Sequence, residues 1–265
     1  MIKTIGISTA GPNKQRCEDA HVITPLKKAV LIAVADGVGS AEHSDKAAGL
    51  AVTEISNFIA KQKFPLKTPK ETLQAAFNHT LSEINNLIAL EKGEERDYDT
   101  TLSAVIYNGS QIAYGHSGDG GVIGLNTEGQ YIAITKPQKG DDNLSVIPFR
   151  ESDKWEFGIA SGDFASVIIA TDGIYDTFFP YLLKGQQNEM YIRMLQFFTN
   201  SNETELREYL ENATHINDDK TFIIATNPIT KVSTMDDEYY QEPDWENLKL
   251  EWNKKAYPHL FSEET

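Results

Sequence analysis

The sequence predicts an α+β fold in which antiparallel sheets carry helices in separate pairs. The first observation behind this prediction is that two helical stripes of apolar residues, over residues 47–59 and 73–88, follow one another without a strand between them. That order argues against alternating βαβ units. The second observation is that runs of strand character lie on either side of turn residues at 108–109 and at 126–129, which predicts two β-hairpins.

The first elements of the chain are a buried strand and a helix pair. Residues 29–35 are continuously apolar, which predicts a strand that is buried on both faces and stops at Asp36-Gly37. A helix is predicted next, because apolar residues recur at helical spacing at Ala47, Leu50, Ala51, Ile55, Phe58 and Ile59. Thr68, followed by Pro69 and Glu71, predicts a capping box that opens the second helix.

The two hairpins come after the helix pair. The strands of the first are predicted at 101–107 and 111–115, and those of the second at 121–125 and 130–134. In both cases a glycine in the turn supplies the backbone conformation that a tight connection needs.

The last third of the body mixes both types of element. Residues 167–171 predict a second buried strand, which again stops at an Asp-Gly pair. Helices are predicted at 191–198 and 203–212, and a closing strand at 221–226.

The tail, residues 228–265, has a different composition. It holds nine acids, four lysines and six aromatic side chains. Six aromatic residues are too many for a freely solvated linker, so we expect the tail to pack on the body or on a partner.

Composition limits the classes of partner. The chain of 265 residues has 24 Lys plus Arg against 39 Asp plus Glu, which gives a net charge of −15. Such a surface repels the phosphates of DNA and RNA, so we expect no nucleic-acid partner. A hydrophobic content of 40% is ordinary for a globular protein and excludes a wholly disordered chain.

Cysteine usage and apolar runs bear on location. The single cysteine, Cys17, excludes an internal disulfide and a zinc site built on cysteines. The first residues lack the apolar core of a signal peptide, and the strongly apolar run 29–35 is too short to span a bilayer. We therefore expect a soluble, cytoplasmic protein with no membrane partner, and we expect a monomer.

Four acidic pairs lie where predicted strands begin or end. They are Glu18-Asp19, Asp36-Gly37, Asp172-Gly173 and Asp218-Asp219. Carboxylates that converge at the ends of buried strands repel one another unless they are protonated or bind a cation. Oxygen ligands suit Mg²⁺ or Mn²⁺ better than zinc. Each pair alone is more often a turn, because Asp-Gly is a common turn dipeptide, but the ordered set favours a cation site.

Six segments carry these acids and their neighbours in a fixed order. They are Lys14-Gln15-Arg16-Cys17-Glu18-Asp19-Ala20, Val34-Ala35-Asp36-Gly37-Val38-Gly39-Ser40, Asp99-Thr100-Thr101-Leu102, His116-Ser117-Gly118-Asp119-Gly120, Ala170-Thr171-Asp172-Gly173-Ile174-Tyr175-Asp176 and Asp218-Asp219-Lys220-Thr221. Together they resemble the motifs of the metal-dependent protein phosphatase 2C family, in its bacterial branch. The resemblance implies a four-layer α/β/β/α sandwich, with two antiparallel sheets flanked by helix pairs. It implies a catalytic domain over residues 1–227 and leaves 228–265 as an acidic, aromatic-rich C-terminal extension.

The resemblance also implies an activity and a set of metal ligands. The activity is hydrolysis of phosphoserine and phosphothreonine in proteins by a water that two Mn²⁺ or Mg²⁺ ions activate. Asp36 looks like the carboxylate that bridges both ions, and Gly37 would lend its carbonyl oxygen. Asp172 and Asp218 would complete the metal ligands.

Two further acids would take part in catalysis. Glu18 and Asp19 resemble groups that bind the metals or orient their waters, so the resemblance implies a catalytic set of Asp36, Asp19 and Glu18. The substrate would be a phosphoprotein made by a cognate serine/threonine kinase.

The chain departs from the family's motifs near these ligands. The family's phosphate-binding Arg is Lys14 here, while Arg16 lies two residues nearer to the acids. Either side chain could bind phosphate, and the fork of a guanidinium slightly favours Arg16. Val38 replaces the His of the eukaryotic enzymes. A weak third ion could bind Asp97 or Asp99, although a solvated loop is the stronger interpretation of that run.

Other readings stay open at this point. Asp119 lies in a Gly-Asp-Gly turn without the family's usual Ser-Arg, and His116 is predicted to be a structural histidine at a strand end. The chain could be a catalytically weak signalling module that binds a partner protein, or a phosphohydrolase for small molecules. The intact set of Asp36, Asp172 and Asp218 favours the enzyme. The short stretch 136–158 leaves little room for a flap over the site, which favours protein substrates.

Overall fold

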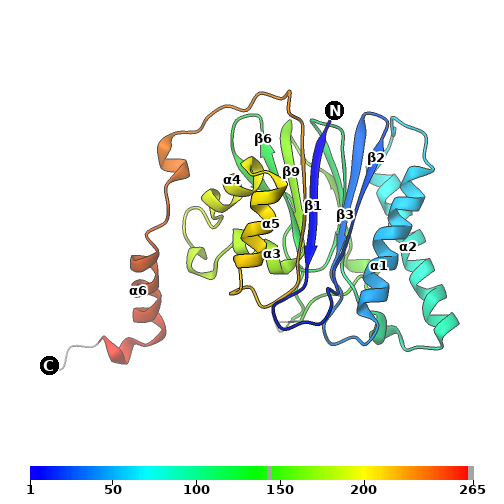
Figure 1. Ribbon diagram of the computed structural model, residues 1–265, viewed down its shortest axis with the longest axis horizontal. Coiled ribbons are helices and arrows are strands. Elements are labelled where there is room, and N and C mark those ends of the chain that lie inside the picture. The colour runs from blue at the N-terminus through cyan, green and yellow to red at the C-terminus, as the bar shows by residue number, and fades with distance from the viewer. Residues whose placement is uncertain (142–144, 262–265) are drawn as a thin grey trace.

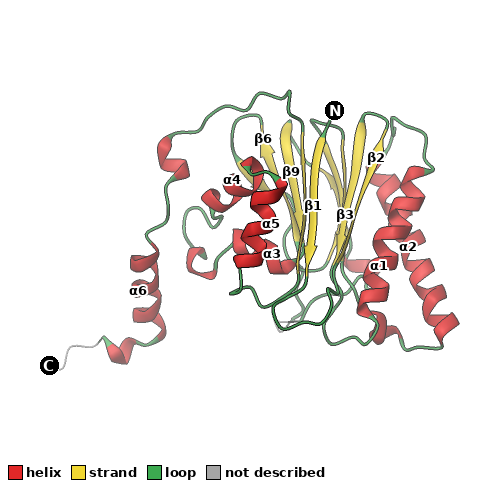
Figure 2. Cartoon of the chain, in the orientation of Figure 1, coloured by secondary structure: helices red, strands yellow, loops and turns green. Residues whose placement is uncertain are grey.

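Four layers of secondary structure make up the body of the protein in a computed structural model that describes residues 1–141 and 145–261 (Figures 1 and 2). Two five-stranded antiparallel sheets lie face to face. Helices α1 (Ser44–Ala60) and α2 (Pro69–Glu91) cover one outer face. The other outer face carries α3 (Asp172–Phe178), α4 (Ile192–Asn200) and α5 (Glu203–Asn212). The predicted fold class and layer order are confirmed.

Each sheet is antiparallel throughout. The sheet under α1 and α2 has the order β2-β3-β4-β5-β8, and its strands are β2 (Ala20–Leu26), β3 (Ala29–Ala35), β4 (Leu102–Tyr107), β5 (Ile112–Ser117) and β8 (Glu156–Ile159). The second sheet has the order β1-β10-β9-β6-β7, and its strands are β1 (Lys3–Thr9), β6 (Gly121–Asn126), β7 (Tyr131–Ala133), β9 (Phe164–Ala170) and β10 (Lys220–Thr226). Both predicted hairpins, β4–β5 and β6–β7, are present.

The apolar residues of β3 explain why this strand has no polar face. Leu31 and Ala33 contact the layer of α1 and α2, while Val30, Ile32 and Val34 face the other sheet. Successive side chains of a strand point to opposite faces, so a strand between a helix layer and a sheet is apolar at every position. The continuous run 29–35 is therefore the signature of a central strand in a four-layer sandwich.

Antiparallel pairing brings several strand ends together at one end of the sandwich. β3 and β5 end where their neighbours β2 and β4 begin, and β9 ends where β6 and β10 begin. Each of the acidic pairs noted in the sequence lies beside one of these strand ends. The topology thus collects acids from distant parts of the sequence at one edge of both sheets.

One local expectation is wrong. Thr68 lies at the start of α2, but its side chain accepts no hydrogen bond from the helix, so the capping box does not form. Its carbonyl instead accepts hydrogen bonds from the backbone N–H and the hydroxyl of Thr72. β9 stops before Asp172, as predicted, and Asp172 begins helix α3.

Four elements lack a clear pattern in the sequence. β1, β2 and β8 are only half buried over most of their length, so neither a continuous apolar run nor a clean alternation marks them. α6 (Trp245–Ala256) has no buried residue, and its apolar stripe is short, with only Trp245, Leu248 and Trp252 at helical spacing.

The tail packs on the body through its first half. After β10 the chain crosses one end of the sandwich and reaches a short 3₁₀ helix, η4 (Asp237–Tyr240), and then α6, the outermost element in Figure 1. Tyr239 and Tyr240 pack against the core between the second sheet and its helices. The backbone N–H of Tyr131 donates a hydrogen bond to the Tyr239 hydroxyl at 2.8 Å. Within residues 1–141 and 145–261, no helix combines the length and apolar character needed to cross a bilayer.

We predict that Tyr239→Ala lowers the free energy of unfolding by about 1–2 kcal/mol, because it removes partly buried ring surface and leaves the Tyr131 N–H without its partner. Tyr257→Ala is the matched control, since Tyr257 is 45% exposed and lies outside the three core clusters. Urea unfolding of both variants measures the difference. Equal unfolding free energies for the two variants would contradict the packed position of η4.

Candidate metal centre

Three aspartates from separate elements converge at the shared end of the two sheets. Asp36 follows β3, Asp119 lies between β5 and β6, and Asp172 begins α3. One carboxylate oxygen from each lies within 4.8 Å of the others. A cluster of oxygen ligands of this kind fits a hard divalent cation such as Mg²⁺ or Mn²⁺.

The backbone beside Asp36 is fixed by the start of β4. The carbonyl of Asp36 accepts hydrogen bonds from the N–H of Thr101 and the hydroxyl of Thr100, both at 2.8 Å. In return, the N–H of Asp36 donates to the Thr101 hydroxyl at 2.9 Å. The Asp99-Thr100-Thr101 segment of the sequence thus holds the first aspartate of the cluster in place.

Asp19 lies behind the cluster and is almost fully buried. Its Oδ2 accepts a hydrogen bond from the hydroxyl of Thr171, the residue before Asp172, at 2.8 Å. No donor among the described residues satisfies its buried Oδ1, although the carboxyl of Asp36 lies within hydrogen-bonding reach of Asp19. Such an orphaned carboxylate oxygen is costly in a folded protein unless a water or a cation satisfies it. The unsatisfied oxygen of Asp19 is therefore consistent with a bound ion and its water at this site.

Burial and mutual repulsion raise the pKa values of the acids. Burial raises the pKa of Asp172 to about 7, with the charges of Asp119 and Asp218 adding to the effect. Burial also raises the pKa of Asp19 to about 6. The pKa of Asp36 lies well above its usual range because of burial and the charges of Asp19 and Asp172. Raised pKa values mean that these carboxylates are poorly compensated by the protein alone.

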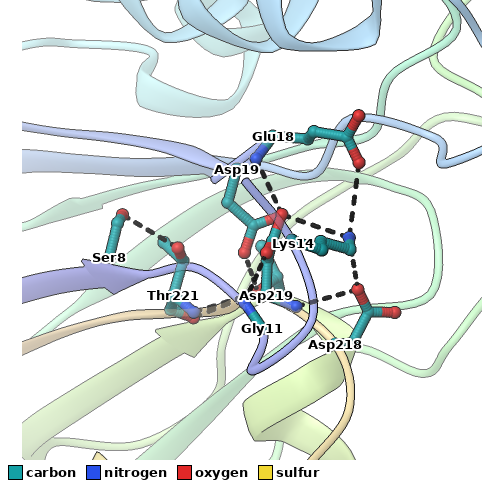
Figure 3. A network of polar contacts seen from close by, with 9 residues as sticks. Ser8, Gly11, Lys14, Glu18, Asp19, Asp218, Asp219 and Thr221 are labelled. Atoms are coloured by element: carbon teal, nitrogen blue, oxygen red, sulfur yellow. Dashed lines mark hydrogen bonds and ion pairs between the residues drawn. The ribbon is translucent and has the colours of Figure 1, made fainter. Parts of the chain in front are cut away.

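Lys14 is the positive charge beside the Asp218-Asp219 pair (Figure 3). Its ammonium lies 2.7 Å from an oxygen of Asp218 and 3.2 Å from one of Asp219. It also lies 3.3 Å from the carboxylate of Glu18. Although burial opposes the charge, the hydrogen bond and charge of Asp218 raise the pKa of Lys14 above its usual range, so it stays protonated.

Asp218 and Asp219 have different roles in the structure. Asp219 is buried, and its two oxygens accept hydrogen bonds from the N–H groups of Gly11 and Glu18, which ties the loop after β1 to β10 (Figure 3). Asp218 has a half-exposed side chain that faces the same cavity as Asp36 and Asp172. It lies outside the group of three converging carboxylates, although its charge reaches Asp172.

Arg16 does not lie in the site. Its guanidinium forms an ion pair with Asp45 of α1 at 3.0 Å, and its side chain is 59% exposed. Lys14 lines the cavity of the aspartates and Arg16 does not. The structure thus favours Lys14 over Arg16 as the phosphate-binding side chain, because Lys14 lines the cavity while Arg16 is paired with Asp45.

Asp97 and Asp99, the residues considered for a third ion, do not join the cluster of three aspartates. Asp99 lies at the cavity but forms an ion pair with Arg150 at 2.5 Å, and Asp97 does not line the cavity. Asp119 joins the cluster instead, and the ammonium of Lys139 lies 2.9 Å from its carboxylate. The Gly-Asp-Gly sequence alone does not predict that Asp119 joins the cluster. Its place there depends on where β5 ends and β6 begins.

The stretch 136–158, of which 142–144 lie outside the described residues, forms part of the cavity wall. Lys139, Arg150 and Glu151 all line the cavity, which has a volume of about 1350 Å³. The described part of this stretch thus contributes to the cavity wall, while the expectation that it leaves little room for a flap stays a prediction. No motif in the sequence marks Lys139 and Arg150, the two basic side chains of the stretch that line the cavity.

Two glycines beside the aspartates allow close approach of backbone segments. A Cβ at Gly37 would lie 2.8 Å from the carbonyl oxygen of Glu18, and one at Gly173 would lie 2.1 Å from that of Asp219. A side chain at either position would separate the loops that carry the acids. Gly after Asp is thus required here by packing.

His116 is structural, as predicted. It is fully buried in β5, its Nε2 contacts the carbonyl of Lys136 at 3.1 Å, and its Nδ1 contacts the hydroxyl of Ser103 at 2.7 Å. Burial lowers its pKa to about 4, so it is neutral near pH 7.

Comparison with known proteins agrees with this geometry. The profile of the family described as "Protein phosphatase 2C" matches residues 10–212. A curated relative, "Protein phosphatase PTC7 homolog fig" of Drosophila willistoni, is 24% identical over 186 residues, which span 64% of this chain and 57% of the fly protein. The match thus covers little more than half of the relative's length.

Serine/threonine phosphatases are among the solved structures of similar fold. The serine/threonine phosphatase Stp1 of Staphylococcus aureus superposes with a TM-score of 0.65 at 13% identity, covering 86% of this chain and 95% of Stp1. The catalytic domain of the serine threonine protein phosphatase PstP, solved in complex with two manganese ions, has a TM-score of 0.61 at 16% identity and covers 85% of this chain and 97% of that one. At these identities the likeness bears on the fold, while the family profile covers most of the chain. The chain belongs to the protein phosphatase 2C family.

Proposed function

We propose that this chain is a metal-dependent phosphatase that hydrolyses phosphoserine and phosphothreonine in proteins. The observation that carries the proposal is the convergence of Asp36, Asp119 and Asp172 in one cavity with the ammonium of Lys14. Three acids with few compensating charges suit divalent cations, and a cation beside them suits the phosphate of a substrate.

The residues divide into metal ligands and groups that act on substrate or water. Asp36, Asp172, Asp119 and the Gly37 carbonyl would hold the ions, with Asp218 joining them once Lys14 turns to the substrate. We propose two Mn²⁺ or Mg²⁺ ions. When bound, they neutralise phosphate oxygens and supply a nucleophilic water.

The protein's own contribution is to position these groups. Asp19 has a free Oδ1 that can accept a hydrogen bond from a water at the site and so orient it. Lys14 would bind the phosphate as a point charge, while Glu18 keeps its ammonium near the cavity. Within a preorganised cavity of this kind, correct orientation removes much of the entropic barrier.

The wider setting is also a proposal. We propose a catalytic domain over residues 1–227 with 228–265 as an extension, acting as a monomer in the cytoplasm on a phosphoprotein made by a cognate kinase. Assays with p-nitrophenyl phosphate and with phosphoserine, phosphothreonine and phosphotyrosine peptides, each with EDTA or added Mn²⁺, test the activity. Full metal binding without turnover on any of these substrates would favour a partner-binding module instead.

We predict that Asp36→Asn lowers turnover at least about 100-fold, because it removes the charge that the ligand set shares, while the fold stays intact. Isothermal titration should show weakened or lost Mn²⁺ binding, and circular dichroism an unchanged spectrum. Wild-type turnover together with normal Mn²⁺ binding in this variant would refute the proposed centre.

We predict that Lys14→Ala raises KM for a phosphopeptide about 10-fold or more, because a charge-assisted contact to phosphate is lost. Arg16→Ala is the matched control, and its KM should stay within about twofold, since an exposed ion pair contributes little. Steady-state kinetics of both variants decide the assignment. The reverse pattern would return the phosphate-binding role to Arg16.

We predict that the metal-free protein loses stability as pH rises from about 4 to 7. The folded-state pKa of Asp172 (about 7) and of Asp19 (about 6) lie above the unfolded value near 3.9, so the folded state binds more protons in this range. Ionisation through the folded pKa values therefore removes stability. Mn²⁺ should restore it, and more strongly at pH 8 than at pH 5.

Thermal melts in EDTA across this pH range test the prediction. Asp172→Asn provides the control, because the amide cannot ionise. Its melting temperature should fall several degrees less than that of the wild type between pH 4 and pH 7. Parallel pH profiles for the wild type and this variant would show that the acids do not repel one another as the structure requires.

A further inference from the structure

The cavity of the aspartates has a second wall that is aromatic and apolar. Tyr191 and Met194 come from the start of α4, Tyr209 from α5, and Trp245 from the first residue of α6. All four line the same cavity as Asp172 and Asp218. The tail of the chain therefore contributes directly to the space in which a substrate would bind.

Trp245 is held in a defined position by its neighbours. Its ring packs edge-on against Tyr191, with ring centroids 5.0 Å apart and planes at 83°. The indole N–H donates a hydrogen bond to Oε1 of Glu242 at 2.6 Å, and the Tyr191 hydroxyl donates to the same oxygen at 2.6 Å. Both rings are half buried and already held by these contacts, so a ligand that binds them pays little conformational entropy to order them.

These contacts decide what the wall can offer to a ligand. The indole N–H and the hydroxyl hydrogen of Tyr191 are both donated to Glu242, so neither ring has a free donor and the remaining ring surface is mainly carbon. The negative charge of Glu242 is matched by Arg193, whose Nε lies 3.6 Å from the second carboxylate oxygen. The wall therefore favours an apolar or aromatic side chain over a charged one.

We infer that Trp245 and Tyr191 form a subsite for an apolar or aromatic residue that flanks the phosphorylated residue of the substrate. The ligand must carry its phosphate at the acidic end of the cavity and an apolar group at the other wall, and a phosphopeptide has both. This inference rests on the proposed phosphatase function. It makes Trp245 a specificity-determining residue and Glu242 its positioning residue.

One half of the subsite, Trp245 with Glu242, lies outside the family match, while Tyr191 lies inside it. The family profile ends at residue 212, before Glu242 and Trp245. The tail thus adds a recognition element to a cavity whose three converging aspartates and Lys14 lie in the matched region.

The test compares phosphoserine peptides that differ at one position. The reference peptide has alanine at all flanking positions, and a phenylalanine is then moved through the positions on both sides of the phosphoserine. For the full-length wild type, phenylalanine at its best position should lower KM about 3-fold to 10-fold relative to the reference, the range expected for an aromatic contact. In Trp245→Ala this ratio should fall to about one.

Two further variants separate recognition from structure. Trp245→Phe keeps an aromatic ring and should keep most of the preference. Trp252→Ala removes another aromatic residue of α6, which packs on Tyr181 and does not line the cavity, and it should leave the preference unchanged. Melting temperatures of all three variants show whether the fold is retained.

The outcomes are distinct. A wild type that hydrolyses the reference peptide but gains nothing from phenylalanine at any position overturns the subsite and leaves the phosphatase in place. A rise in kcat/KM for both peptides alike in Trp245→Ala also overturns it, because the wall would then exclude substrate. A metal-loaded wild type that hydrolyses no phosphopeptide overturns the proposed function, and the subsite with it.

Discussion

Repulsion between buried carboxylates is the constraint on which the rest of this structure depends. Asp36, Asp119 and Asp172 lie close together at the ends of central strands, and burial raises the pKa values of Asp36 and Asp172. A fold tolerates such a cluster only if rigid elements hold it and positive charge compensates it. Here the rigid elements are two stacked sheets that end at the same edge.

The charges around the cluster are arranged in two groups. Lys14 forms ion pairs with Asp218 and Asp219, and Lys139 forms one with Asp119. One lysine thus compensates the charge of each acidic group. Lysine is a compact point charge on a flexible stem and can move aside without breaking a planar fork of hydrogen bonds. The buried Asp219, by contrast, accepts two backbone hydrogen bonds and keeps the loop of Lys14 in place.

The tail extends this arrangement beyond the sandwich. Tyr239 attaches η4 to the core, and from there the chain places Trp245 at the cavity. A tail with nine acids would be repelled by the acidic centre if its charges lay at the cavity, but the group it presents there is an indole. Apolar contacts thus allow an acidic segment to approach a site that is itself negative.

The sequence by itself determined the layers and the order of the acids. The continuous run 29–35 requires a strand covered on both faces, and two helical stripes in succession exclude a parallel sheet, because these patterns reflect burial that is local to each element. Tertiary structure alone decided which charges share a cavity. Asp119 joined the cluster, Arg16 turned to Asp45 on α1, and Trp245 reached the cavity from a distant segment. No periodicity encodes these outcomes, because electrostatic partners are chosen by distance in space, and distance is set only when the sheets and their loops have packed.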